Sequence, residues 1–379
     1  IDVASFSAAE ADQLRRAMSS KRSVERMEAL HARLLEGMAT NGVPPEVAEQ
    51  IFEKLKAFAD FGFPESHAFS FAYLVYASAW LKVHHPEAFY AGLLAAQPMG
   101  FYSPQTLVAD ARRRGVEVRR ASVVASEVQA SVERADDGAL AVRLGLAPVR
   151  GIGEKTAERL VHARQEAPLA DLADLARRVR LSAAQLEALA TAGALEDLGH
   201  QRREGLWLAG ALAAESGTRS GHWVQEPLPL TAVGTNVPEL PAMDQVSTAV
   251  ADVWATGVSV DSFPTQFRRE DLEAGGVLRV ADVPGAGHGS RVQVAGVVTH
   301  RQRPATAAGV TFLSLEDETG LLNVICSAGL WQRYRQVVRS SAALVVRGVV
   351  EHADGVTNLM ADQVTELSLR VPSRSRDFR

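Results

Sequence analysis

Cysteine is almost absent from the sequence, since Cys326 is the one thiol in 379 residues. An internal disulfide and a metal site built from cysteines are therefore excluded, and a reduced, cytoplasmic compartment is expected. Long apolar segments are also lacking, because no run approaches the ~18 residues of a membrane-spanning helix. The first residues carry neither the basic start nor the apolar segment of a signal peptide. We expect a cytoplasmic protein with no membrane partner.

The carboxylate pattern of nucleotidyl transfer is missing as well. Two-metal phosphoryl transfer needs clustered carboxylates in a fixed frame, and the sequence contains no Asp-x-Asp pair. Its histidines do not show the HExxH spacing of a zinc site. We therefore expect no catalytic residue and no metal ligand in this chain. The sequence also lacks an initiator Met and begins almost directly on a predicted helix, so we expect a piece of a longer protein.

Excess positive charge is the third thing the chain lacks. Its net charge of −5 argues against a protein that binds polyanions over its whole surface. Local basic surfaces are still compatible with this charge, because the arginines occur in pairs and triplets, although most such clusters are solvated helix faces. At ~100–200 residues per domain, the length predicts two or three domains.

Periodicity divides the chain into a helical part and a β-rich part. We expect a helical domain over 1–115, a small β-hairpin with a tandem helix-hairpin-helix over 116–215, a linker with one helix over 216–285, an OB-fold barrel over 286–370 and a basic tail over 371–379. Ser7 with Glu10, and Ser182 with Gln185, form capping patterns that begin helices. The segment 68–85 is apolar almost all round a helix, and we expect it to be buried.

The stretch Leu144–Arg164 has the pattern of a helix-hairpin-helix, with a turn of helix, a glycine hairpin and a second helix from Glu154. Glycine allows positive φ, so successive backbone N–H groups can point the same way, beside the positive end of a helix dipole. Such a corner binds a phosphate. The alternative is a plain glycine turn between packed helices. The expected DNA contacts are Arg150, Gly151, Ile152, Gly153, Lys155 and Thr156.

The region from 291 to 369 predicts five strands with a helix between the third and the fourth, which is the order of an OB-fold. Such barrels bind single strands on the second and third strands and on the loop after the first. Arg301 and Arg303 lie in that predicted loop, and Phe312 on the second strand could stack a base. The alternative is that Phe312 faces the barrel interior, because both faces of this strand carry apolar residues and the alternation does not show which face is buried.

Taken together, the chain resembles the bacterial C-family DNA polymerases, which include the α subunit of polymerase III, and among them the ImuC-type error-prone polymerases. The resemblance covers essentially the whole chain in the family's own order. It rests on the segments Asp12–Met18, Phe58–His67, Trp80–Pro86 and Gln97–Tyr102, the hairpin, the barrel and the ending Ser375–Arg379.

The resemblance implies a multidomain protein, mostly α in its fingers and tandem helix-hairpin-helix, followed by a C-terminal all-β OB-fold barrel. Residues 1–115 would be the distal fingers, and the hairpin would grip duplex primer-template through its phosphates. Glu65 departs from the family's Lys at that position. The catalytic aspartates and their Mg²⁺ would belong to a palm outside this chain. The residues implied to contact the incoming dNTP are Arg15, Arg16, Lys21, Ser66 and His67.

The resemblance also implies partners. The stretch Gln225–Leu230 stands where relatives carry a clamp-binding peptide, and it lacks the closing Phe. An ImuB-type accessory polymerase would then bring the chain to the β sliding clamp. The implied function is error-prone, DNA-directed synthesis in translesion synthesis and DNA repair. The alternatives are a non-catalytic DNA-binding adaptor made of the hairpin and the barrel, and a protein-interaction module that does not touch DNA.

Overall fold

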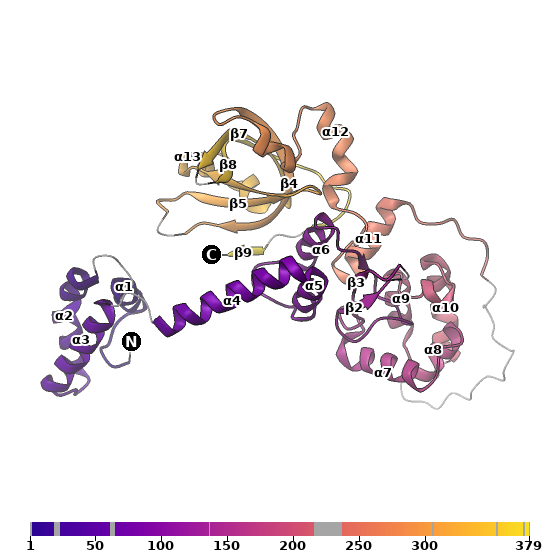
Figure 1. The fold of residues 1–379 in the computed structure, drawn as a ribbon, viewed down its shortest axis with the longest axis horizontal. Coiled ribbons are helices and arrows are strands. Elements are labelled where there is room, and N and C mark those ends of the chain that lie inside the picture. The colour runs from indigo at the N-terminus through magenta and orange to yellow at the C-terminus, as the bar shows by residue number, and fades with distance from the viewer. Residues whose placement is uncertain are drawn as a thin grey trace. The chain divides into compact units, whose positions relative to one another are not determined.

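In the computed structural model of the chain, residues 2–18, 23–60, 65–135, 137–215, 237–304, 307–353, 355–373 and 376–378 are described. They form two compact units, 1–84 and 85–379. Figure 1 labels their helices and strands. Within these ranges, no helix is long and apolar enough to cross a membrane.

The first unit is helical. It contains α1 (Ala8–Met18), α2 (Ser23–Thr40), α3 (Pro45–Asp60) and α4 (Glu65–His84). The predicted capping box begins α1, because the Ser7 N–H donates to Glu10 Oε2 at 2.7 Å and the Glu10 N–H donates to Ser7 Oγ at 3.3 Å. The core lies between α1, α2 and α3 and includes the buried residues Ala17, Met27, Leu34 and Phe52.

The predicted burial of the apolar helix is wrong for α4. Phe69 is 75% exposed, Tyr76 73% and Val83 70%. No described residue of α4 belongs to the core of the first unit. A helix that is apolar all round has no preferred face, so its burial depends on the surfaces that surround it rather than on its own pattern.

The second unit begins with α5 (Pro86–Ala95) and α6 (Pro104–Arg113) and continues into a small sheet. Its strands are β1 (Val118–Arg119), β2 (Ser131–Arg134) and β3 (Leu140–Arg143), in the order β1-β3-β2, with β1 parallel and β2 antiparallel to β3. This sheet confirms the predicted hairpin.

The hairpin region follows as α7 (Gly153–Glu166), α8 (Leu172–Val179), α9 (Ala183–Thr191), the short helix η1 (Glu196–Leu198) and α10 (Arg202–Glu215). The predicted capping box begins α9, with both reciprocal hydrogen bonds between Ser182 and Gln185. These helices share one core with α5, α6 and the small sheet. That core includes the fully buried Leu146, Leu160 and Leu189.

Helix α11 (Gln245–Thr256) joins the hairpin core, because Ala255, Val258 and Val260 belong to the same buried cluster. Its position is fixed by the side chain of Asp252, which is 3% exposed. Asp252 Oδ1 accepts from Arg202 Nη2 at 2.6 Å and from Arg120 Nε at 3.4 Å. The Arg202 guanidinium, 6% exposed, also donates to the Thr191 carbonyl at 2.8 Å. One carboxylate therefore ties α11 to both α10 and the end of β1.

The barrel confirms the predicted OB-fold order. Its elements are β4 (Arg291–Gln302), β5 (Thr311–Glu316), β6 (Leu321–Cys326), α13 (Ala328–Arg333), α14 (Arg335–Ser340), β7 (Ala343–Ala353) and β8 (Val356–Glu366). The strands run in the order β5-β6-β8-β7-β4, and β4 also pairs with β5, which closes the barrel. Strand β9 (Arg376–Phe378), in the predicted tail, pairs in parallel with β4 at residues 300–302. Before the barrel lie η2 (Pro264–Arg268), α12 (Arg269–Ala274) and η3 (Val280–Gly285).

Two buried carboxylates at the end of β5 join the barrel to its neighbours. Glu316 accepts from Thr106 Oγ1 at 2.9 Å and from Arg113 Nη2 at 3.0 Å, both on α6. Asp317 accepts from Arg269 Nη2 on α12 at 2.9 Å. Burial raises the pKa of Glu316 to about 7, although the charge and hydrogen bond of Arg113 act in the opposite direction.

The first prediction concerns Asp252. Asp252→Asn leaves the buried Arg202 and the partly buried Arg120 without their shared counter-charge, so the free energy of unfolding should fall by about 3–5 kcal/mol. Urea denaturation followed by circular dichroism measures this change. Asp261→Asn is the matched control, because Asp261 pairs with the same Arg120 but is 66% exposed, and should cost no more than about 1 kcal/mol. Equal losses in the two variants would contradict the role given to Asp252.

The second prediction concerns the pH dependence of stability. Between the ordinary carboxyl pKa and about 7, folded Glu316 keeps a proton that the unfolded chain has lost. The contribution of this group to stability is therefore full at low pH and falls as the pH rises through this window. Glu316→Gln should remove that downward slope, measured by urea denaturation at several pH values from 4.5 to 8. Glu366→Gln, at an exposed position of β8, should keep it.

Candidate nucleic-acid interface

The hairpin before α7 has the geometry that its glycines predict. Gly151 has φ 75° and Gly153 has φ 65°, and α7 begins at Gly153, one residue before the predicted start. The predicted turn of helix before the hairpin is wrong. Residues 146–152 form hydrogen-bonded turns instead, with Val149 N–H donating to the Leu146 carbonyl and Ile152 N–H to the Val149 carbonyl. The buried side chain of Ile152 fixes the turn to the core.

The N-terminus of α7 is open to a ligand. Its cap residue, Ile152, provides no side-chain hydrogen bond to the first turn. The first N–H groups of a helix have no intrahelical acceptor, and they carry the positive end of the helix dipole. Gly153 and Lys155 are exposed at this end. The arrangement suits an anion such as a phosphate.

The predicted contact residues around the hairpin fall into two groups. Arg150, Gly151, Gly153 and Lys155 are exposed, whereas the side chains of Ile152 and Thr156 are buried. Gln185 Nε2 donates to both Thr156 Oγ1 and the Gly151 carbonyl at 3.3 Å. The Gln185 amide therefore ties the turn to α7, with the Thr156 hydroxyl as one of its acceptors. Ile152 and Thr156 can meet a ligand only through their backbone.

Trp254 on α11 lies beside the hairpin, although no motif in the sequence pointed to it. Its ring centroid is 4.7 Å from the Arg150 guanidinium carbon, and the Arg150 N–H donates to the Ala255 carbonyl at 2.8 Å. Trp254 is 48% exposed. A pattern of residues along α11 cannot reveal a contact with a turn about a hundred residues earlier in the chain.

The second, degenerate hairpin is closed. Its turn lies at residues 192–194, between α9 and η1, and Gly193 there has φ 73°. A Cβ at this position would lie 2.8 Å from Glu196 Oε1 and 2.9 Å from Arg202 Nη2. The chain's own charged groups therefore fill the space over this turn.

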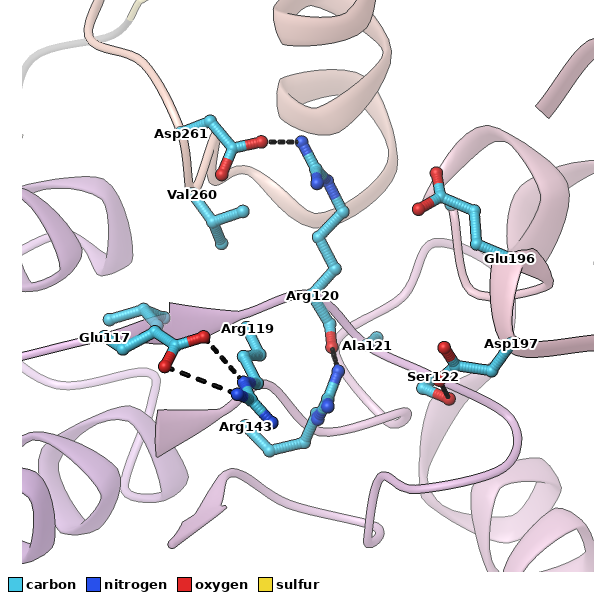
Figure 2. Close-up of a pocket in the computed structure, with 12 residues that line it drawn as sticks. Glu117, Arg119, Arg120, Ala121, Ser122, Arg143, Glu196, Asp197, Val260 and Asp261 are labelled. Atoms are coloured by element: carbon cyan, nitrogen blue, oxygen red, sulfur yellow. Dashed lines mark hydrogen bonds and ion pairs between the residues drawn. The ribbon is translucent and has the colours of Figure 1, made fainter. Parts of the chain in front are cut away.

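A polar pocket lies next to the second hairpin (Figure 2). Its arginines are paired within the protein. Arg119 donates to Glu117 at 2.7 Å, Arg143 donates to Glu133 at 2.7 Å, and Arg120 pairs with Asp261. The lining has four carboxylates and three guanidinium groups, so this pocket is not an anion site, and the Arg119-Arg120 cluster of the sequence serves the fold.

The barrel residues predicted to contact a single strand are not equivalent. Arg301 is 7% exposed, and its guanidinium donates to the carbonyls of Val338 at 2.7 Å and of Ser341. It therefore holds the end of α14, and we exclude it from the interface. Arg303 is exposed, and its guanidinium lies 5.0 Å from the Trp331 ring centroid. Phe312 is 38% exposed, so its side chain lies on the outer face of the barrel and not in the interior.

The residues implied to contact a nucleotide are described only in part. Arg15 and Arg16 lie on α1 with exposed side chains, and Asp12 pairs with them at 2.8 Å and 2.6 Å. The hydrogen bond from Arg15 lowers the pKa of Asp12, with the Arg16 charge acting in the same direction. Ser66 and His67 belong to α4, but their side chains, like Lys21 as a whole, lie outside the described residues.

The described residues contain no group of three or more His, Cys, Asp and Glu side chains that could hold a metal ion. Cys326 is fully buried, and burial raises its pKa to about 12, so the thiolate does not form at neutral pH.

Two parts of the chain match known families. Residues 115–205 match the family described as "Helix-hairpin-helix motif", and residues 292–372 match "OB-fold nucleic acid binding domain". Among solved structures, the hypothetical protein ygiW from E. coli aligns with 25% of this chain and 92% of its own at 16% identity, with a TM-score of 0.20, a likeness too low to bear on the fold.

Curated relatives align with the whole chain. An error-prone DNA polymerase of Mycolicibacterium paratuberculosis is 54% identical over 381 residues, and one of Mycobacterium tuberculosis is 55% identical. The protein of the same name from Cutibacterium acnes is 46% identical over 419 residues. These alignments cover 100% of this chain and 34–36% of the relatives, so the chain spans about a third of their length.

Proposed function

We propose that the chain belongs to the error-prone DNA polymerases and forms the distal fingers, helix-hairpin-helix and OB-fold portion of such an enzyme. The proposed activity of the whole protein is template-directed nucleotidyl transfer in translesion synthesis and DNA repair. The observation that carries the proposal is the identity of 54% over the whole chain. This identity includes the helical region 1–115, which an adaptor made of the hairpin and the barrel would not need.

The hairpin would hold duplex DNA through its backbone. The open N-terminus of α7, with Arg150 and Lys155 on either side of it, supports this role. Contacts to phosphates position a protein on a duplex without reading its sequence. Such a contact suits a polymerase, which must hold any product that it has just made.

The barrel would bind the single-stranded template. Phe312 offers an exposed ring on β5, and Arg303 a cation at the end of β4. Stacking on aromatic side chains is tolerant of sequence, because every base has a π-face.

The fingers would contact the incoming dNTP through Arg15, Arg16, Lys21, Ser66 and His67. Fixed cations stabilise the charge that develops on the leaving pyrophosphate. The Asp12 carboxylate now holds Arg15 and Arg16, so a triphosphate would have to displace it. Polymerase chemistry requires a divalent metal ion, and we propose that Mg²⁺ is held by palm residues outside this chain.

The proposed partners are primer-template DNA, an ImuB-type accessory polymerase and, through it, the β sliding clamp, and the proposed compartment is the cytoplasm. The degenerate clamp motif Gln225–Leu230 lies outside the described residues. A tight, direct complex between this chain and the clamp, with no other protein present, would contradict recruitment through an accessory partner.

The third prediction tests the hairpin. Lys155→Glu should weaken binding of duplex DNA uniformly across sequences and reduce the slope of log K against log salt by about one. Gly151→Val should act in the same direction, because a β-branched residue does not adopt the positive φ of the turn. Fluorescence anisotropy over a salt series measures both effects. The same variants in the full-length polymerase should give shorter primer-extension products.

The control for the hairpin is Arg339→Glu, which makes the same change of charge at an exposed site on α14. It should leave duplex affinity close to that of the wild type. If Lys155→Glu and Gly151→Val also left it unchanged, the hairpin would not be a phosphate site, and a protein-interaction module would be favoured.

The fourth prediction tests the barrel. Phe312→Ala should weaken the binding of a short single strand by about 1–3 kcal/mol, the usual cost of losing one stacked base. Met360→Ala is the control, since Met360 is 37% exposed on β8 of the same barrel. Equal losses in the two variants, measured by anisotropy with a labelled oligonucleotide, would argue against stacking at Phe312.

A further inference from the structure

We propose that Trp254 is a positioning residue for Arg150, so that α11 is part of the surface that holds the duplex. This inference rests on the proposed function of the hairpin as a phosphate site. The contact that carries it is a cation–π contact, in which the Arg150 guanidinium carbon lies 4.7 Å from the centroid of the Trp254 ring.

Arg150 differs in its contacts from three other arginines of the hairpin region. Arg164 pairs with Glu127, Arg178 with Asp174, and Arg202 with Asp252, all within 3.1 Å. Among the described residues, no carboxylate pairs with the Arg150 side chain. Its guanidinium is exposed and is held by an aromatic ring instead of by a counter-charge.

The contact with Trp254 leaves donors of the guanidinium available. The guanidinium carbon lies over the ring, and a guanidinium has five N–H donors, more than one aromatic face can engage. An arginine held in this way can still donate a pair of hydrogen bonds to a phosphate. A carboxylate partner would occupy the same N–H groups and would repel the phosphate. The contact with Trp254 therefore orients Arg150 without competing with the proposed ligand.

The position of Trp254 is set by the core beneath it. Asp252, two residues earlier, is held by Arg202 and Arg120, and the Ala255 carbonyl accepts from the Arg150 backbone N–H at 2.8 Å. Both the backbone and the side chain of Arg150 thus contact α11. This helix lies beyond residues 216–236 in the chain, so a segment distant in sequence would complete the hairpin site.

The fifth prediction is a double-mutant cycle on duplex affinity, measured by anisotropy with the full 379-residue chain. Trp254→Ala should weaken binding about two- to fivefold, the range of an exposed cation–π contact, and Arg150→Ala should weaken it more. In the Arg150→Ala background, Trp254→Ala should have no further effect. Trp254→Phe, which keeps an aromatic face, should restore most of the affinity. Circular dichroism should show all variants folded.

The outcomes separate the inference from the function on which it rests. If Arg150→Ala leaves duplex affinity unchanged, the proposed phosphate site at Arg150 fails. If Arg150→Ala weakens binding but Trp254→Ala does not, the positioning role of Trp254 is overturned. If the two losses add, Trp254 contacts DNA by itself and does not act through Arg150. Trp207→Ala, which removes another indole that is 54% exposed, is the control and should leave the affinity unchanged.

Discussion

The candidate duplex-binding surface depends on the buried carboxylate of Asp252. It accepts from two guanidinium groups that belong to different segments of the hairpin region, Arg202 at the start of α10 and Arg120 after β1. Burial alone would lower the pKa of Arg120, but Asp252 and Asp261 hold it above its usual value. A buried ion pair is weak evidence of net stability, because desolvation offsets most of the attraction. The pair instead fixes the register of α11. A shift of this helix by one turn would take the buried carboxylate away from Arg202 and leave the more exposed Glu196, at 3.6 Å, as its counter-charge.

The barrel is joined to its neighbours by the same kind of contact. Glu316 and Asp317, both fully buried, take their partners from α6 and α12. Many of the arginines that the sequence presents as basic clusters are therefore bound internally by carboxylates. A net charge of −5 is therefore compatible with a protein that we propose binds DNA, because much of the opposite charge is paired inside the fold. The phosphate-binding potential lies in a few cations that the fold leaves exposed, such as Arg150 and Lys155, rather than in the overall charge.

Local features of the fold could be predicted from the sequence, and tertiary ones could not. The capping boxes at Ser7 and Ser182, the glycine turn and the succession of strands and helices along the barrel segment each depend on residues close together in the chain. The exposure of α4, the burial of Arg301 and the contact between Trp254 and Arg150 depend on segments that meet only in the folded chain. The face of the strand on which Phe312 lies also depends on tertiary contacts. Thr311 and Leu313 lie on the opposite face, and only their packing partners distinguish them from Phe312.

The two hairpins show why a glycine motif alone does not identify a binding site. Gly151 and Gly193 both have positive φ and both precede a helix. No atom lies within 4 Å of a Cβ built at Gly151, whereas Glu196 and Arg202 lie within 3 Å of one at Gly193. The first turn therefore leaves room for a phosphate, and the second uses its space to place Arg202 against Asp252. Because Asp252 in turn fixes the helix that carries Trp254, the closed hairpin supports the open one.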